Sequence, residues 1–249
     1  MKALITGASS GLGRDFAYKL ANDGYDLVLV ARSKDKLNDI KNDIKTNVEV
    51  EVLDLSDKNN ALKLYKKYSN QIDLLINNAG FGDCGFFTNT DLDNELNMID
   101  LNVVTCHILT KLFLKEFLKK DSGQILNVAS SAAFEPGPLM ATYYATKAYV
   151  LHLTESINEE LRRKKSNVFI CALCPGPVST NFNKVAGVSF NLESLESYDV
   201  AKYAVKQMFK KKVVIIPGFK IKMGVFALRL LPRSLVRKIA YKIQKNKEN

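Results

Sequence analysis

The chain is poor in the residues that build metal sites and disulfide frameworks. Its 249 residues include no tryptophan, two histidines and four cysteines. The two histidines, His107 and His152, do not stand in a ligand spacing, which disfavours both a metal centre and a Ser-His-Asp triad. The cysteine pair in CALC, at 171–174, has no second pair to complete a zinc site. We therefore expect no bound metal and no disulfide framework.

Long apolar runs are missing as well. No segment approaches the roughly 18 consecutive apolar residues that crossing a bilayer requires. The first residues, KALIT, have the pattern of a strand that leads directly into a glycine-rich turn, which is not the pattern of a secretory signal. We therefore expect a cytoplasmic protein.

Acidic residues are nearly missing from the last fifth of the chain. Residues 201–249 contain 14 Lys and Arg but only one acid, Glu248, so the net charge of +10 originates there. A positive charge confined to one end argues against nucleic-acid binding by the body of the protein. It indicates a local cationic surface instead.

Short apolar segments alternate with longer segments of helical period. The strand candidates are ALIT, LVLVAR, VEVEVLD, LLIN, QILNVA, VFICAL and VVIIP. Helices are expected at 11–23, 33–46, 56–69, 91–119, 142–164 and 197–211, with a long loop at 178–196. This alternation predicts an α/β fold, a Rossmann-like doubly wound parallel sheet of about seven strands with helices on both faces.

A glycine-rich turn, TGASSGLG at residues 6–13, follows the first predicted strand and opens the first predicted helix. Gly7, Gly11 and Gly13 would let the backbone approach a pyrophosphate, and the helix N-terminus would offer unpaired N–H groups to it. The segment predicts a dinucleotide-binding turn.

Ser130, Tyr143 and Lys147 form the most informative spacing in the chain. Tyr143 and Lys147 lie one turn apart on one face if their segment is helical. An ammonium about 4 Å from a phenol, at an effective dielectric of about 20, favours the phenolate by about 4 kcal/mol, or about three pKa units. We expect such a lowered pKa for Tyr143, because a general acid/base near neutral pH requires it.

These motifs together resemble the short-chain dehydrogenase/reductase family. TGASSGLG, NNAG at 77–80, Asn102 in DLNVV, the Ser-Tyr-x-x-x-Lys set and CPGPVST at 174–180 occur in the family's order. The resemblance implies an oxidoreductase that moves a hydride between a nicotinamide and a carbonyl or secondary alcohol. It also implies a homodimer or homotetramer.

The resemblance assigns roles to four residues. It implies that Tyr143 is the acid/base, that Lys147 lowers the pKa of Tyr143 and binds the nicotinamide ribose, that Ser130 hydrogen-bonds the substrate oxygen, and that Asn102 supports a relay water.

Two neighbours compete for these roles. Ser131 adjoins Ser130, but Ser130 has the family spacing and adjacent strand residues face opposite sides. Tyr144 has a helical spacing to Lys147 but does not fit Y-x-x-x-K.

The residues at the end of the second predicted strand indicate which nicotinamide cofactor the protein binds. Arg32 and Ser33, with Lys36 a turn later, stand where an NAD-preferring site would place an acid. A guanidinium can hold a 2′-phosphate, so we expect NADP(H) in preference to NAD(H); the alternative is a solvated basic helix start. The resemblance adds further expected cofactor contacts: Ser9, Ser10, Leu12, Asp54, Leu55, Asn78, Ala79, Gly80, Tyr143, Lys147, Pro175, Gly176, Val178 and Thr180.

On this basis we expect residues 1–218 to form an NADP(H)-binding catalytic Rossmann domain. Loops near the expected substrate site are rich in apolar residues, which favours an apolar alcohol or ketone, although simple loop packing explains them equally well. These residues are Phe81, Phe86, Phe87, Phe134, Leu139, Met140, Phe182 and Phe190.

Residues 219–249 are predicted to form a basic amphipathic extension of the same domain. After Pro232, apolar residues recur at helical spacing: Leu235, Val236, Ile239, Ala240 and Ile243. Two interpretations stay open. The helix either lies on a membrane interface or packs on the domain or in an oligomer interface.

A catalytically silent NADP(H)-binding sensor or scaffold is the competing function, with a C-terminal helix that binds a membrane or a partner. The complete set Asn102, Ser130, Tyr143 and Lys147 favours an enzyme, because a binding module needs no acid/base.

Overall fold

The structure is a computed structural model that describes residues 1–180 and 194–245. Within these residues, seven parallel strands form one sheet in the order β3-β2-β1-β4-β5-β6-β7. The strands are β1 (Lys2–Thr6), β2 (Asp26–Ala31), β3 (Val48–Val52), β4 (Leu74–Asn77), β5 (Gln124–Val128), β6 (Phe169–Leu173) and β7 (Val214–Ile215).

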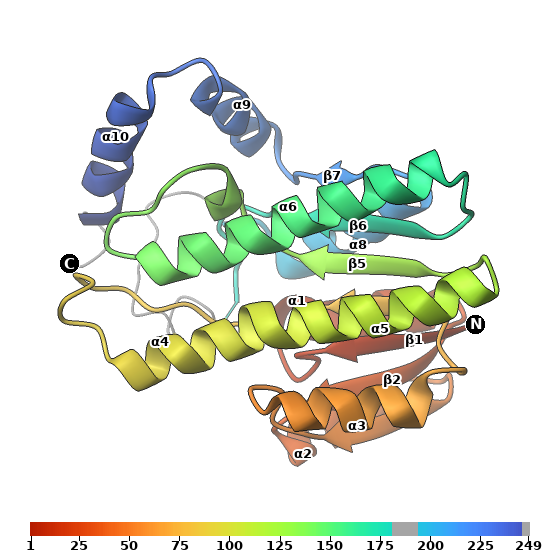
Figure 1. The fold of residues 1–249 in the computed structure, drawn as a ribbon. Helices are drawn as coiled ribbons and strands as arrows, with labels where there is room; N and C mark the ends of the chain where they lie inside the picture. The colour runs from red at the N-terminus through yellow and green to blue at the C-terminus, as the bar shows by residue number, and fades with distance from the viewer. Residues whose placement is uncertain (181–193, 246–249) are drawn as a thin grey trace.

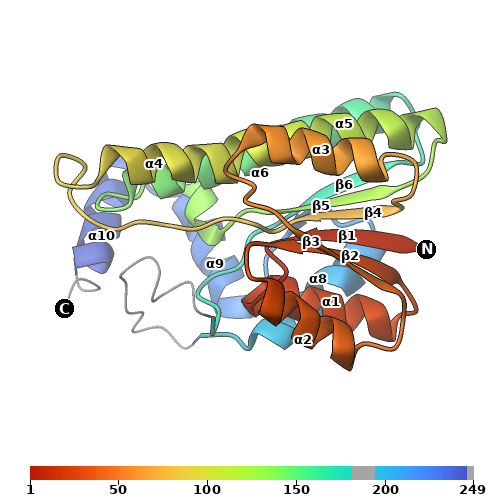
Figure 2. The same cartoon turned by 90° about the horizontal axis from the view of Figure 1, so that it is seen from below.

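Helices cover both faces of the sheet (Figures 1 and 2). One face carries α1 (Gly11–Asn22), α2 (Lys34–Asp43) and α8 (Ser197–Phe209), and the other carries α3 (Lys58–Tyr68), α5 (Cys106–Lys119) and α6 (Ala141–Arg163). The shorter α4 (Leu92–Ile99) leads into α5, and α9 (Phe219–Leu228) and α10 (Arg233–Lys245) complete the described chain. The predicted fold class is confirmed.

Strand β2 shows why the sheet is buried on both sides. Leu27 and Leu29 pack into the layer of α1, α2 and α8, whereas Val28 and Val30 pack into the layer of α3, α5 and α6. Successive side chains of a strand point to opposite faces, so a continuous apolar run fills two cores.

Parallel pairing places the carboxyl ends of all strands at one edge. Strand β1 pairs with β2 on one side and with β4 on the other, so the chain reverses its winding direction there. Ligands of open α/β sheets bind in the crevice outside such a switch point. The glycine-rich turn follows β1, and Asn78–Gly80 follows β4, at this position.

Two predicted elements differ in detail. The helix expected at 91–119 is continuous, but Asp100–Thr105 forms a π-helical turn between α4 and α5. The last strand is reduced to Val214–Ile215, since Pro217 has no N–H for a further ladder bond. Part of the loop expected at 178–196 lies outside the described residues, and Val178 pairs with Leu195 in an isolated bridge.

Candidate active site

The glycine-rich turn touches the backbone that follows β4. Gly7 has a φ of +66°, and a Cβ on it would lie 2.9 Å from Ala79 Cα. A Cβ on Gly13 would lie 2.2 Å from the carbonyl oxygen of Gly7. Only glycine fits both positions, and this brings the predicted cofactor residues Asn78 and Ala79 against the turn.

Thr6, which the sequence analysis did not single out, holds these two segments together. Its buried hydroxyl accepts hydrogen bonds from the N–H of Asn78 (2.9 Å) and of Ala79 (3.0 Å). Asn78 Nδ2 donates in turn to the Thr6 carbonyl, at 3.0 Å. The only sequence signal is that Thr6 is the first residue of TGASSGLG.

The segment after β6 reaches the same turn. A Cβ on Gly11, which has a φ of +51°, would lie 2.9 Å from Thr180 Cγ2. Pro175 accepts a hydrogen bond from the Ser131 N–H (2.8 Å), which ties the predicted residues Pro175 to Thr180 to the turn after β5.

The start of α1 is open to an anion. Ser10 is in extended conformation, with no side-chain capping hydrogen bond, and the first turn of α1 contains no acid. The N–H groups of this turn and the positive end of the helix dipole lie at the switch point, where Ser9 precedes the helix, while Leu12 in its first turn packs against the core.

Arg32 and Asp54 lie within electrostatic reach of each other just beyond the ends of β2 and β3. Hydrogen bonding from the Ser56 N–H (3.0 Å) lowers the pKa of Asp54, and the charge of Arg32 lowers it further. Ser33 begins α2 and Lys36 is exposed in its first turn, while Leu55 is buried and its carbonyl accepts a hydrogen bond from Thr105.

Tyr143 and Lys147 occupy one buried face of α6, with exposed fractions of 8% and 6%. Lys147 Nζ lies 5.8 Å from the centroid of the Tyr143 ring and donates to the Val128 carbonyl at 2.9 Å. Ser130 begins the 3-10 turn Ser131–Phe134, and its hydroxyl is hydrogen-bonded with Tyr143. The three predicted residues therefore meet at the carboxyl end of β5.

The expected direction of the Tyr143 pKa shift is wrong for this arrangement. Burial raises the pKa of Tyr143 to about 12, and the hydrogen bond with Ser130 lowers it only in part. Burial lowers the pKa of Lys147 to about 8. Both groups lose water on burial, and the ammonium donates to the Val128 carbonyl, so desolvation sets the direction of both pKa shifts.

The Val128 carbonyl is placed by a buried amide network. Asn127 is fully buried, and its Nδ2 donates to Thr154 on α6 at 2.9 Å. Its Oδ1 accepts from Asn77 Nδ2 on β4, also at 2.9 Å. The network locks β4, β5 and α6 in register around Lys147.

Asn102 lies in the π-helical turn and is buried. Its Oδ1 accepts from the Phe81 N–H (3.1 Å), and its Nδ2 donates to the Phe81 carbonyl (2.9 Å) and to Thr146 Oγ1 (3.1 Å). The side chain therefore fixes the loop after β4 against α6. Single π-helical turns inside α-helices are frequent at functional sites.

The competing residue Tyr144 packs beside Tyr143, but its hydroxyl is bonded to another segment of the chain. The Tyr144 hydroxyl accepts a hydrogen bond from Gln244 of α10, and its ring lies where a Cβ of Gly137 would be. Burial raises the pKa of Tyr144 above its usual value.

The apolar loop residues divide into separate groups. Phe81 and Met140 pack around Tyr143, whereas Phe86 and Phe87 are exposed. Leu139 is buried with a φ of +67°. The expected residues Phe182 and Phe190 lie outside the described residues, as do 181–193 as a whole.

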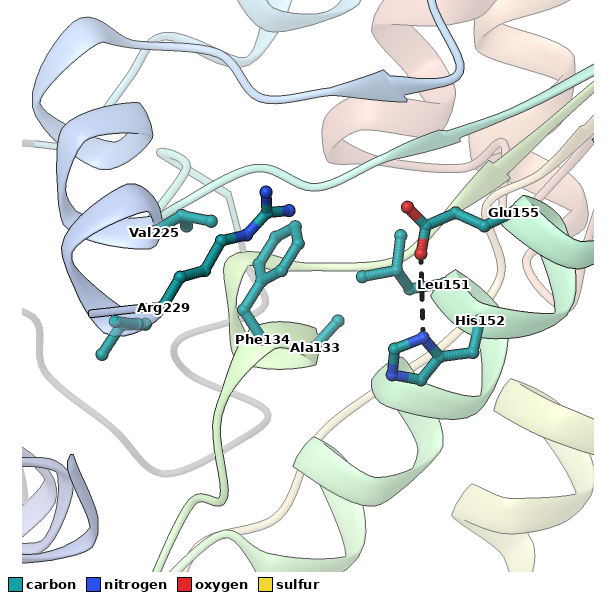
Figure 3. A pocket seen from close by; sticks show the side chains of 8 residues that line it. Ala133, Phe134, Leu151, His152, Glu155, Val225 and Arg229 are labelled. Atoms are coloured by element: carbon teal, nitrogen blue, oxygen red, sulfur yellow. Dashed lines mark ion pairs between the residues drawn. The ribbon is translucent and has the colours of Figure 1, made fainter. Parts of the chain in front are cut away.

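Phe134 lines a different pocket, of about 230 Å³, between α6, the 3-10 turn and α9 (Figure 3). The pocket also contains Arg229 and the pair His152–Glu155, whose Nδ1 and Oε2 are 3.7 Å apart. None of Asn102, Tyr143 and Lys147 lines it. The pocket is therefore separate from the predicted catalytic residues.

Neither a metal site nor a membrane-spanning helix is found among the described residues. In residues 1–180 and 194–245 no three His, Cys, Asp or Glu side chains are grouped as a metal site. Across the same residues, no helix is both long and apolar enough to cross a membrane.

Comparison with known proteins agrees with the fold and with the expected family. Residues 1–189 match the family model of short chain dehydrogenases. The chain is 35% identical over 213 residues to an uncharacterized oxidoreductase of Staphylococcus epidermidis, covering 82% of this chain and 90% of that protein. It is 32% identical over 213 residues to the very-long-chain 3-oxoacyl-CoA reductase of Homo sapiens, covering 82% and 67% respectively.

A solved structure supports the same assignment. The short-chain dehydrogenase of Sphingobium yanoikuyae, in complex with NADPH, matches with a TM-score of 0.83 and 30% identity over 94% of each chain. The fold and the family match together define a Rossmann-like member of an oxidoreductase family. The chain belongs to the short-chain dehydrogenase/reductase family.

Replacing Gly80 tests the packing behind Lys147. A Cβ there would lie 2.7 Å from Asn102 Oδ1 and 3.4 Å from Lys147 Nζ. We expect Gly80→Ala to displace the Asn102 amide and lower the free energy of unfolding by about 1–3 kcal/mol in urea titration. Gly224→Ala, with no heavy atom within 4 Å, is the control and should be neutral or stabilising. Equal stability of both variants would contradict this packing.

Proposed function

We propose that the protein is an NADP(H)-dependent oxidoreductase that interconverts an apolar ketone and its secondary alcohol. The observation that carries the proposal is the meeting of Ser130, Tyr143 and Lys147 in one buried group beside the switch point. A hydroxyl pair and an ammonium in a dry site are what a developing alkoxide needs. A binding module would have no use for the acid/base.

The residues present fit a nicotinamide dinucleotide. The turn that contains Gly7, Gly11 and Gly13 packs too closely on Ala79, on Thr180 and on its own backbone to admit a Cβ, and the N-terminus of α1, which has no side-chain cap, lies beside it. These groups would hold the pyrophosphate. Lys147 and the segment from Pro175 to Thr180 would hold the nicotinamide half.

Arg32 supports NADP(H) as the cofactor. It stands at the end of β2, close enough to Asp54 for its charge to lower that carboxyl's pKa, and a guanidinium binds a phosphate bidentately. Fold likeness alone does not choose the cofactor. A family member from Burkholderia phymatum, 25% identical with a TM-score of 0.82 over 90% of this chain and 91% of that one, is a complex with NAD.

The chemistry divides between cofactor and protein. A bound nicotinamide supplies or accepts the hydride at the substrate carbon. Tyr143, whose pKa of about 12 keeps it protonated at neutral pH, donates the proton to the carbonyl oxygen during reduction. Ser130 donates a hydrogen bond to the same oxygen, and the Lys147 ammonium stabilises the negative charge that grows there and on the phenol.

Two features support an apolar substrate. Phe81 and Met140 pack beside the Tyr143 ring, so the surface near the proton donor is apolar. The human relative is named for a 3-oxo thioester with a very long acyl chain, which is an apolar carbonyl compound. We further propose a homodimer or homotetramer, because members of this family usually form oligomers.

Replacing the proton donor tests the proposed function directly. We expect the wild type to oxidise NADPH, followed by its absorbance at about 340 nm, with a panel of apolar ketones and 3-oxoacyl thioesters. The rate with Tyr143→Phe should be at least about 100-fold lower. NADPH binding by fluorescence titration should stay nearly intact. Tyr144→Phe is the matched control and should keep its rate within about threefold, because its hydroxyl bonds to Gln244. Retained turnover in Tyr143→Phe would refute the assignment.

Replacing Arg32 tests the cofactor. Arg32→Asp removes a phosphate partner and adds a repelling charge, so we expect the Kd for NADPH to rise about 10–100-fold and the Kd for NADH to stay within about threefold. Lys45→Asp makes the same charge change at an exposed position beyond α2 and should affect neither. An equal loss of both cofactors would show that Arg32 does not bind the 2′-phosphate.

A further inference from the structure

Helix α9 presents a stripe of apolar side chains to solvent. Phe219, Met223 and Phe226 are 77%, 48% and 56% exposed, and Leu230 just beyond the helix is 72% exposed. Steps of four, three and four residues place them on one face of a helix. Val225, on the opposite side, is buried against the 3-10 turn, as Figure 3 shows.

Helix α10 carries two neighbouring stripes of side chains, one buried and one exposed. The stripe that packs on the protein consists of Val236, Ala240 and Gln244, all buried. The adjacent stripe consists of Leu235, Ile239 and Ile243, which are 43%, 40% and 48% exposed. The apolar face predicted from the sequence is thus only partly used for packing.

The exposed stripes lie in a strongly basic segment. Residues 217–245 contain no Asp or Glu and eight cations: Lys220, Lys222, Arg229, Arg233, Arg237, Lys238, Lys242 and Lys245. At 100° per residue, Lys238, Lys242 and Lys245 border the exposed stripe of α10 on the side away from the buried one.

Charge decides what covers this surface. A second copy in a two-fold contact would bring the same cations face to face, with no acid in 217–245 to pair them. A nucleic acid would satisfy the cations but leave the apolar stripes uncovered. A bilayer with anionic headgroups satisfies both, because its acyl region takes apolar side chains and its phosphates attract lysine and arginine.

We propose that α9 and α10 form a docking surface for an anionic lipid bilayer. The helices would lie in the interface and not cross it, in keeping with the lack of a membrane-spanning helix among the described residues. Both helices lie beyond the carboxyl edge of the sheet (Figure 1).

The docking surface adjoins the catalytic residues. Gln244 of α10 bonds to Tyr144, which directly follows Tyr143, and α9 packs on the turn that directly follows Ser130. A consequence that rests on the proposed function is that a lipid-dissolved ketone reaches the site from the bilayer. Docking itself is independent of that function and is measured without turnover.

Co-sedimentation of the full chain with vesicles tests the proposal. With phosphatidylcholine vesicles that contain about 30% phosphatidylglycerol, at about 50 mM salt, we expect most of the protein to sediment. With phosphatidylcholine alone, or at about 500 mM salt, we expect the partition coefficient to fall at least about tenfold.

Point variants separate the surface from general charge. Phe226→Glu and Ile239→Glu change exposed residues only, and each should weaken partitioning at least about tenfold while circular dichroism stays unchanged. Lys238→Gln with Lys242→Gln should weaken partitioning to the anionic vesicles and reduce its salt dependence. Leu62→Glu, an equally drastic change at a 39% exposed residue of α3, is the matched control and should bind like the wild type.

Several results would overturn the proposal. Failure of the wild type to sediment with anionic vesicles at low salt is one, and equal binding by Phe226→Glu and Ile239→Glu is another. A third is that Phe226→Glu converts an oligomer to a monomer in light scattering while vesicle binding persists, because the surface would then join copies of the chain. NADPH oxidation plays no part in these readouts, so the docking surface and the proposed function can fail separately.

Discussion

The site depends on the burial of one ammonium. Lys147 Nζ lies in the interior at the end of β5, where the Val128 carbonyl accepts its hydrogen bond at 2.9 Å. Burial of an ammonium is unfavourable unless polar partners compensate, and here it lowers the pKa of Lys147 to about 8. The Asn127 network, which links β4, β5 and α6 beside the Val128 carbonyl, is understandable as the support that this burial requires.

Topology brings the other half of the site to the same edge. Because β1 lies beside β4, the glycine-rich turn contacts Asn78 and Ala79, and the Thr6 hydroxyl joins the two segments. Residues far apart in sequence, such as Gly11 and Thr180, come within van der Waals contact there. A parallel sheet thus collects five motifs at the carboxyl edge of its strands.

Much of this arrangement could be predicted from the sequence, because it follows from local periodicity. Alternating strands and helices defined the sheet, and the four-residue spacing placed Tyr143 and Lys147 on one face of α6. The direction of the Tyr143 pKa shift could not be predicted, since it depends on how deeply Tyr143 is buried and on which group accepts the hydrogen bond of the Lys147 ammonium.

Tertiary contacts between distant segments could not be predicted from the sequence either. The bond between Gln244 and Tyr144 joins residues 100 positions apart, and nothing local in either segment indicates it. For the same reason, the apolar face of α10 gave no sign that Val236 and Ala240 would be buried while Leu235 and Ile239 stay exposed. The hydrogen bonds of the Thr6 hydroxyl to Asn78 and Ala79 could not be predicted, because they depend on the pairing of β1 with β4.

The most direct test of this account is the pH dependence of a single turnover. In the proposed mechanism, reduction of a soluble apolar ketone by enzyme-bound NADPH needs Lys147 as an ammonium and Tyr143 as a phenol. Lys147 loses its proton first, so the rate constant should be level below neutral pH and fall as pH rises through about 8. A rate constant that stays level or increases up to a pH of about 10 would contradict the role of the buried ammonium.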